Sequence, residues 1–585
     1  MLVFIVLLTR LWSMQIINGE SYKKEAAQNS LREATTIAPR GRIFDCNGKV
    51  LVGNRSTMAV LAPTTIVNDT PLVLRLAKIL GMTKQEVIDK ATTKKEAALD
   101  LRVIAIDVPM KTVAYIEEHS TSFGGVEVQA RAVRTYPNGS VAAHVLGYTG
   151  EISDTQLNSS TFKNYDPSDI VGKTGAESSF ESVLQGVRGR RVLEVNAQGK
   201  IQTIVSETQP GSGQDIELTL DLKTQKVAEA SLKKAIMRSR AAGNKAVAGS
   251  AVVMDVNTGA IVAMASYPTY NPEEFINGIS TKTWKRFNSK SSSYPLTNRA
   301  IMSVYPPGST FKAFTSLTGL NYGLINTATT FDCVGYWTGL GKTWGKWCWL
   351  HTGHGIQNLY SALINSCDTY FYNVGLRDYK TGKENQQKLA RQFGFGKLTG
   401  IDLPSEARGR VPDAKWKAAW NANYPEYKKW LPGDSVNLAI GQGDLLVTPL
   451  QLVTAYSAIA NGGTIYQPHV FKSALSSEGK TVITAKKKVT GKPSVSNSSV
   501  QTLQSNLRAV ISQSASGPKL SNVGVPVSGK TGTAQKTEEN DYAWFAAYAP
   551  SNNPKYAVVA MIEQGGGGGT YALPVVDDIL VSLFK

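Results

Sequence analysis

The chain has 585 residues, which is too long for one hydrophobic core, so two or three domains are expected. Hydrophobic residues make up 42% and charged residues 18%, which excludes wholesale disorder. The formal net charge of +18 indicates an anionic partner. The basic residues are dispersed and no nucleic-acid motif accompanies them. We therefore expect no nucleic acid partner, and an anionic membrane surface or cell wall fits the charge better.

The first residues are apolar as far as Ile17, with Arg10 as the only charge. A membrane span needs about 20 apolar residues, so this stretch resembles the second half of one. No basic flank precedes it, and no small-residue cleavage site of a signal peptide follows it. We expect residues 1–19 to be an incomplete single-pass membrane anchor in the inner membrane, with the rest outside the cytoplasm.

Residues 20–213 are expected to form a β-rich, non-catalytic pedestal of the dimerisation-domain type. A strand near Arg40 is broken by a turn at Asn47-Gly48. Thr70 and Pro71 are expected to cap a helix that ends at Gly81, and Thr83 with Glu86 forms a capping box for the next helix. These two helices indicate a small helical subdomain. The composition becomes loop-rich over 207–213, where we place the domain boundary.

Residues 214–585 predict the second large domain. A strand over 216–220 and a helix from about 224 are followed by a hairpin of strands 250–256 and 260–265. Strands return at 542–548 and 556–562, and a helix covers 575–584. Strands at both ends with helices between them indicate an α/β sandwich whose sheet joins the two ends of this domain. The whole chain is thus a multidomain α+β or α/β protein.

The stretch from Tyr305 to Phe314 carries the first chemical motif. Pro306, Pro307 and Gly308 oppose a helix, so Ser309 is expected at the N-terminus of the helix that follows. Lys312 lies three residues later on the same helix face, with its amine within reach of the serine hydroxyl. A nearby amine that loses its proton can activate a serine as nucleophile. A single Ser-x-x-Lys arises by chance in long chains, and its alternative interpretation is an exposed helix start.

Two further motifs follow in order. Ser366-Cys367-Asp368 is expected in a turn between helices, and Lys530-Thr531-Gly532-Thr533 in a strand. Ser-x-x-Lys, Ser-x-Asn/Asp and Lys-Thr-Gly, in this order, form the signature of penicillin-binding proteins and serine β-lactamases. An earlier Lys-Thr-Gly begins at Lys173. It precedes the serine and opens a helix-like run instead of lying in a strand, so we do not assign it as the third motif.

Three of the four cysteines, Cys333, Cys348 and Cys367, fall within 35 residues, with His354 among them. These ligand types suit a closed tetrahedral Cys₃His zinc site, although the spacing is not that of a zinc finger. A disulfide is the alternative outside the cytoplasm, and free thiols are the third possibility. His351 is the reserve ligand. Cys46 has no evident partner, and we expect it to be buried and inert.

The chain resembles the class B penicillin-binding proteins, and most of all their elongation type, the penicillin-binding proteins 2. The three motifs above carry the resemblance, together with residues 40–48, Tyr136-Pro137 and a Gly-Lys-x-Gly-x-Glu motif at Gly172. The resemblance implies a serine-type D,D-transpeptidase on a pedestal, which crosslinks peptidoglycan stem peptides and binds β-lactam antibiotics. Asp368 in place of the commoner Asn resembles the elongation type and argues mildly against a division-type enzyme.

The resemblance also gives the site residues their expected roles. Ser309 is the nucleophile, Lys312 the base held neutral by cationic neighbours, and Ser366 the proton relay. Asp368 fixes the loop and the lysines, and Lys530 supplies positive field. The substrate carboxylate is expected at Thr531, Gly532 and Thr533, and the oxyanion hole at the backbone N–H groups of Ser309 and Thr533.

The resemblance further implies a structural zinc on Cys333, Cys348, His354 and Cys367, and no organic cofactor. The implied partners are a RodA-like glycosyltransferase of the SEDS family and an MreC-like scaffold. A division-type transpeptidase remains the alternative function. A β-lactamase or β-lactam sensor and a non-catalytic wall scaffold fit less well, the first for lack of an identifiable deacylating base and the second because all three motifs are intact.

Overall fold

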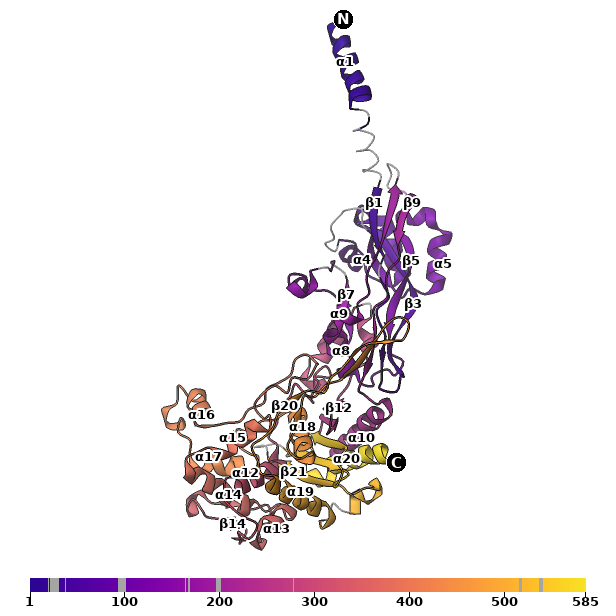
Figure 1. The fold of residues 1–585 in the computed structure, drawn as a ribbon. Coiled ribbons are helices and arrows are strands. Elements are labelled where there is room, and N and C mark those ends of the chain that lie inside the picture. Colours follow the sequence, from indigo (N-terminus) through magenta and orange to yellow (C-terminus); the bar gives the residue numbers. More distant parts are fainter. Residues whose placement is uncertain are drawn as a thin grey trace.

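The computed structural model describes residues 1–18, 20, 31–36, 38–92, 101–163, 165–166, 169–195, 201–276, 278–514, 518–535 and 540–585. The molecule is elongated, with helix α1 at one end, a β-rich pedestal in the middle and a large mixed domain at the other end (Figure 1). The C-terminus lies in the large domain (Figure 1).

Helix α1 (Leu2–Trp12) continues into one π-helical turn, Ser13–Ile17. Its apolar side chains are exposed. Throughout the described part of the chain, every helix is too short or too polar to cross a membrane. The membrane anchor therefore stays a prediction.

The described part of the pedestal contains one short strand pair, β6 (Thr149–Glu151) with β7 (Ile170–Gly172), and two larger sheets. The smaller has the order β1 (Leu31–Thr36), β8 (Gly189–Val195), β9 (Ile201–Thr208). The larger has the order β19-β18-β10-β2-β3-β4, with β5 (Glu127–Thr135) also paired to the long strand β3 (Val50–Pro63). The other members of this sheet are β2 (Ile43–Phe44), β4 (Leu101–Ile106), β10 (Asp215–Leu218), β18 (Phe471–Leu475) and β19 (Thr481–Thr484). Strands from beyond residue 214 thus extend the pedestal sheet and couple the two halves.

The predicted helical subdomain is confirmed as helices α3 (Thr70–Leu80) and α4 (Lys84–Ala91), which share their own hydrophobic core. The capping box of Thr83 and Glu86 is present, and Gly81 ends α3 with a left-handed φ of 67°. One detail of the prediction is wrong. Asp69 caps α3 instead of Thr70, because the Asp69 carboxylate accepts the N–H of Leu72 at 2.9 Å.

A buried ion-pair network holds the pedestal motifs together. Arg40 contacts Glu177 and Glu181, each at 2.7 Å, and Arg134 contacts Glu177 at 2.8 Å. Glu177 lies in the short helix α8 (Gly175–Ser179), which Lys173 precedes. The earlier Lys-Thr-Gly therefore belongs to the pedestal.

The large domain is built on a five-stranded sheet of order β12-β11-β23-β22-β21. The hairpin β11 (Gly249–Asp255) and β12 (Ile261–Tyr267) comes from the start of the domain, and β21 (Ser528–Ala534), β22 (Tyr542–Ala549) and β23 (Tyr556–Ile562) come from its end. The sheet therefore joins the two ends of the domain, as predicted. Residues of β22 and β23 are buried almost throughout, so both faces of the sheet are covered.

Three long helices pack on this sheet: α10 (Leu222–Ala241), α18 (Pro449–Ala460) and α20 (Gly568–Phe584). The last helix begins seven residues before the predicted Val575, within a glycine-rich stretch. Gly568 has little room for a side chain, because a Cβ atom there would lie 2.2 Å from the carbonyl oxygen of Gly532. The helix therefore begins directly against the Lys-Thr-Gly strand.

Candidate active site and metal centre

Ser309 lies in a 3-10 turn, Gly308–Phe311, that leads directly into helix α12 (Lys312–Asn321). Gly308 has a left-handed φ of 54°, and a Cβ atom there would lie 2.7 Å from the carbonyl oxygen of Thr533. Only glycine tolerates both the conformation and the close approach. The serine turn is thereby held against strand β21, which carries the third motif.

The side chain of Lys312 is fully buried. Its Nζ lies 2.7 Å from Asp368 Oδ1, 2.7 Å from the carbonyl oxygen of Ser366 and 3.2 Å from Ser366 Oγ. The sequence predicted this amine next to the hydroxyl of Ser309. The hydrogen bonds of this amine run to the second motif, so the structure joins the first motif to the second through Lys312.

Ser366 lies between helix α13 (Leu359–Ile364) and helix α14 (Asp368–Thr381). Its φ is 50°, a left-handed value that is uncommon outside glycine and is found often at functional sites. This conformation turns both its hydroxyl and its carbonyl oxygen toward Lys312. The predicted inter-helix turn is therefore present, with two groups of Ser366 bonded to one amine.

Lys530 on β21 is also buried, at 1% exposure. Burial, and next the positive charge of Lys312, lower the pKa of Lys530 to about 7, while the Asp368 carboxylate acts in the opposite direction. Among the described residues no carboxylate lies within ion-pair distance of it. Asp368 was expected to fix the lysines, and the structure pairs it with Lys312. Cationic neighbours were expected to keep Lys312 neutral, but the lowered pKa falls on Lys530.

The third motif occupies the edge strand of the sheet, because β21 pairs only with β22. Thr531 is half-buried, Gly532 is buried and Thr533 is exposed. A Cβ atom on Gly532 would lie 3.0 Å from the carbonyl oxygen of Pro307, so this glycine lets the serine turn approach the strand. An edge strand offers unpaired backbone groups to an extended peptide.

A cavity of about 540 Å³ opens beside the serine turn. Polar side chains dominate its wall, and its lining consists of Pro306, Lys346, Tyr372, Asn437, Ile440, Gln442, Gly443, Gln535 and Asp541. Pro306 lies two residues before the serine turn, and Gln535 follows β21. The cavity is therefore suited to a polar, partly charged substrate next to Ser309.

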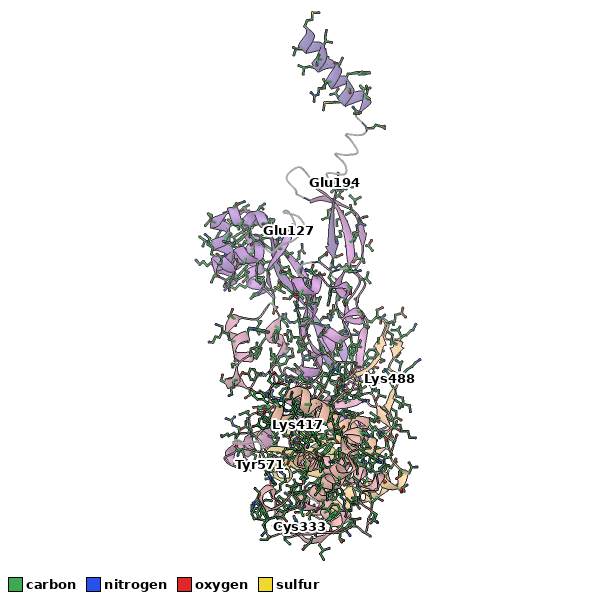
Figure 2. The ribbon with its side chains drawn as sticks, turned by 90° about the vertical axis from the view of Figure 1, so that its left-hand side faces the viewer. Glu127, Glu194, Cys333, Lys417, Lys488 and Tyr571 are labelled. Atoms are coloured by element: carbon green, nitrogen blue, oxygen red, sulfur yellow. The ribbon has the colours of Figure 1, made fainter. Side chains whose placement is uncertain are left out.

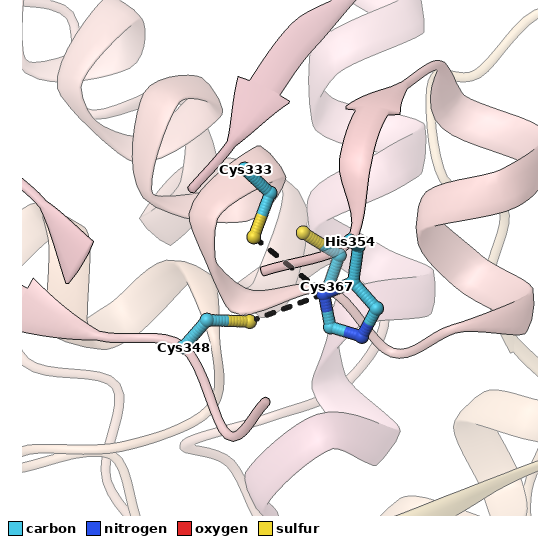
Figure 3. Close-up of side chains that lie close together, drawn as sticks. All are labelled: Cys333, Cys348, His354 and Cys367. Atoms are coloured by element: carbon cyan, nitrogen blue, oxygen red, sulfur yellow. Dashed lines mark hydrogen bonds between the residues drawn. The ribbon is translucent and has the colours of Figure 1, made fainter. Parts of the chain in front are cut away.

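The four predicted metal ligands converge (Figure 3). One donor atom from each of Cys333, Cys348, His354 and Cys367 lies within 4.8 Å of all the others. The sulfur atoms of Cys333 and Cys348 each lie 3.5 Å from His354 Nδ1. Zinc bonds of about 2.3 Å to sulfur and about 2.0–2.1 Å to nitrogen would separate a tetrahedral S–N pair by about 3.5 Å. The donor set therefore fits zinc.

All four cysteines are free of disulfides. A hydrogen bond from Cys367 lowers the pKa of the Cys348 thiol to about 4, and raises that of Cys367 well above its usual value. His351 stays outside the cluster, with its ring 4.6 Å from that of Trp347. Cys46 is half-buried and not buried as predicted. Burial raises the pKa of its thiol to about 11, which disfavours the reactive thiolate.

Comparison with known proteins decides the family. Residues 249–581 match the penicillin-binding protein transpeptidase domain, and residues 35–218 match the penicillin-binding protein dimerisation domain. The chain belongs to the penicillin-binding proteins.

Curated relatives and solved structures agree with this family. The peptidoglycan D,D-transpeptidase MrdA of Acinetobacter baumannii is 32% identical, over 99% of this chain and 86% of that protein. MrdA of Escherichia coli strain K12 is 31% identical, over 98% of this chain and 92% of that protein. The structure of PBP2 in complex with MreC from Helicobacter pylori superposes with a TM-score of 0.80 at 29% identity, over 95% of this chain and 99% of that one. A chain from a peptidoglycan synthase complex superposes with a TM-score of 0.73 at 29% identity, over 100% of this chain and 96% of that one. The prediction of an elongation-type penicillin-binding protein with a transpeptidase domain is confirmed.

Sequence reasoning missed two residues that support the site of this penicillin-binding protein. The backbone N–H of Trp349 donates to Asp368 Oδ2 at 3.0 Å, and the ring of Phe371 lies 5.6 Å from Lys312 Nζ. Trp349 directly follows the predicted metal ligand Cys348, and Phe371 lies one turn into α14. The position of Trp349 beside Cys348 could have indicated its place near the site. The sequence gives no such indication for Phe371, which is one apolar residue among others in a helix.

Proposed function

We propose that this penicillin-binding protein is a peptidoglycan D,D-transpeptidase of cell-wall elongation that forms an acyl-enzyme on Ser309. The observation that carries the proposal is the convergence of three motifs on one buried centre. Lys312 binds both Ser366 and Asp368, while Gly308 and Gly532 bring the serine turn against the edge strand of Lys530. Nearly full-length similarity to MrdA proteins supports the same activity.

The residues act as follows. Ser309 Oγ attacks the carbonyl carbon of the D-Ala-D-Ala peptide bond, and Lys312 accepts the proton of the hydroxyl as general base. Backbone N–H groups of Ser309 and Thr533 stabilise the oxyanion. The bond to the terminal D-alanine breaks, and Ser366 relays the proton from Lys312 to the leaving amine. An amine of a second stem peptide then attacks the ester and frees Ser309.

The charges of the centre support this role for an amine. Of two buried amines, Lys312 is paired with the Asp368 carboxylate, while Lys530 has no carboxylate of the described residues within ion-pair distance. Burial disfavours a second positive charge, so one amine can be neutral near pH 7. The substrate carboxylate would supply the missing negative charge when it binds at Thr531, Gly532 and Thr533. Substrate binding thus restores the balance of charges.

We also propose that Cys333, Cys348, His354 and Cys367 hold one structural zinc ion with all four positions filled by protein. The S–N distances of 3.5 Å support this, as does the absence of a disulfide at these cysteines. Such an ion supplies folding energy and no chemistry. Cys367 lies between Ser366 and Asp368, so the ion would tether the relay loop.

The membrane and partner assignments are proposals of the same kind. An anchor at residues 1–19 would place the catalytic domain on the outer side of the inner membrane. Association with an MreC-like scaffold is supported by similarity to the PBP2 that was solved with MreC. A RodA-like polymerase is supported by similarity to the chain from the peptidoglycan synthase complex.

Fluorescent penicillin tests the activity. Stable labelling of the protein supports a transpeptidase, rapid turnover of the label indicates a β-lactamase, and no labelling indicates a scaffold. Depletion in cells separates the two transpeptidase roles, because rounding follows a loss of elongation and filamentation a loss of division.

A further inference from the structure

Large apolar side chains are exposed around the metal-ligand cluster. Val334, Trp344, Trp347, Trp349 and Ile356 are each more than half exposed, and Trp344 reaches 73%. Soluble proteins seldom expose neighbouring apolar groups of this size unless they bind something. We call this surface, defined by these five residues, the tryptophan platform.

The platform is held in a fixed shape by short strands and hydrogen bonds. Two small antiparallel strand pairs carry it. β14 (Tyr336–Trp337) pairs with β15 (Lys346–Trp347), and β13 (Phe331–Cys333) pairs with β16 (Gly355–Gln357) on either side of them in the chain. The ring of Tyr336 lies 4.8 Å from that of Trp347, whose carbonyl oxygen accepts from the hydroxyl of Tyr372 at 3.1 Å. Preordered aromatic rings lose little entropy when a ligand stacks on them.

The position of the platform narrows its possible ligands. Strand β14 in Figure 1 and Cys333 in Figure 2 lie at the end of the molecule opposite α1. Lys346 lines the cavity and Trp347 follows it in β15, so their side chains point to opposite faces of this strand. The platform therefore lies across the width of one strand from the cavity, within reach of a polymer that continues past Lys346.

We propose that the tryptophan platform binds the glycan strand to which the stem peptides are attached, by stacking of sugar rings on the indole rings. This rests on the proposed function, which places a stem peptide in the cavity. A peptide of four residues spans at most about 14 Å, so its glycan must pass close to the cavity mouth. Sugar rings offer C–H-rich faces to aromatic rings while their polar groups stay in water, and tryptophan suits such an amphipathic contact.

Basic residues at the platform fit the same polymer. Lys342 is exposed beside Trp344, and Lys346 is half-buried at the cavity. Stem peptides carry carboxylates, so a glycan with peptides attached presents both apolar sugar faces and negative charge. The platform thus adds a second contact for the polymer outside the peptide-binding cleft.

The test uses the full chain and peptide-free glycan strands of alternating N-acetylglucosamine and N-acetylmuramic acid. Trp344→Ala/Trp347→Ala should weaken glycan binding at least tenfold, whereas Trp344→Tyr/Trp347→Tyr should stay within about threefold of wild type, because stacking needs a ring. Trp420→Ala is the matched control, since Trp420 is 69% exposed on helix α16 (Ala414–Trp420). Trp349 is left intact because its backbone bonds Asp368.

The proposal is overturned if wild type does not bind the glycan, if polyglutamate binds as tightly, if the double alanine variant binds normally, or if Trp420→Ala loses as much. Should the double variant unfold, Trp344→Ala alone decides, because its indole makes no hydrogen bond to any described residue. Penicillin labelling of wild type separates the two proposals. A protein that is labelled but binds no glycan overturns the platform alone.

Discussion

Lys312 Nζ lies 2.7 Å from Asp368 Oδ1 in the interior of the transpeptidase domain. The second oxygen of the same carboxylate accepts the N–H of Trp349 at 3.0 Å. Asp368 therefore joins the amine of the first motif to the segment that carries two of the metal ligands. The active centre and the metal-ligand cluster are two ends of one hydrogen-bonded unit.

Removal of this carboxylate should be costly. Asp368→Ala leaves the buried ammonium group of Lys312 without its partner, so the free energy of unfolding should fall by about 3 kcal/mol. Glu478→Ala is the control, because the Glu478–Lys480 pair is 72% and 80% exposed and such pairs contribute little. Denaturant unfolding measures both. Equal losses in the two variants would contradict the account of the centre.

The base can be tested by two substitutions at one position. Lys312→Ala should slow acylation by penicillin by several orders of magnitude, because a serine hydroxyl is a weak nucleophile without a base. Lys312→Arg should not restore the rate, since a guanidinium keeps its proton. Stopped-flow acylation kinetics give both values. A near-normal rate in Lys312→Arg would point to a different base.

Stability should depend on pH through Lys530. Its pKa is lowered from 10.5 to about 7 by burial, so between these pH values the unfolded chain holds a proton that the folded protein lacks. The free energy of unfolding should therefore rise with pH in this window, by up to about 1.4 kcal/mol per pH unit, and be insensitive to this group below pH 7. Lys530→Met should lack this rise. Denaturant unfolding at pH 7, 8 and 9 compares the two proteins, and parallel pH profiles would refute the prediction.

Metal removal should affect folding and activity together. Chelation, or Cys333→Ser, should lower the melting temperature and slow acylation, because the cluster tethers the loop with Ser366. Cys46→Ser should do neither, since Cys46 lies in the pedestal far along the chain. Elemental analysis before and after chelation checks the metal itself. A purified protein with well under one zinc per chain and a Cys333–Cys348 disulfide would replace the ion with a crosslink.

Much of the fold followed from local patterns. The hairpin of β11 and β12, strand β23 and the capping box of Thr83 were predictable because turn residues and side-chain periodicity determine them within a few positions. The glycine-rich start of α20 was not, because Gly568 is required there by the close approach of the carbonyl oxygen of Gly532. Contacts between distant segments leave no local signal.

In the site, too, some features follow from the sequence motifs and others depend on contacts between distant segments. Residue order predicted that Lys312, Ser366 and Asp368 would lie together, since the motif set is specific. It did not predict that the lowered pKa would fall on Lys530, because the burial of Lys530 depends on how α12, α14 and β21 pack. The clustering of Cys333, Cys348, His354 and Cys367 was expected from residue type, but only the fold brings their donor atoms within 4.8 Å.

The central claim is that Ser309 forms the acyl-enzyme, and intact-mass spectrometry after incubation with penicillin tests it most directly. The wild-type protein should gain the mass of one penicilloyl group, and peptide mapping should place it on Ser309. Ser309→Ala should gain none and keep its melting temperature, because loss of one half-buried hydroxyl costs little stability. A penicilloyl adduct on Ser309→Ala would contradict the account.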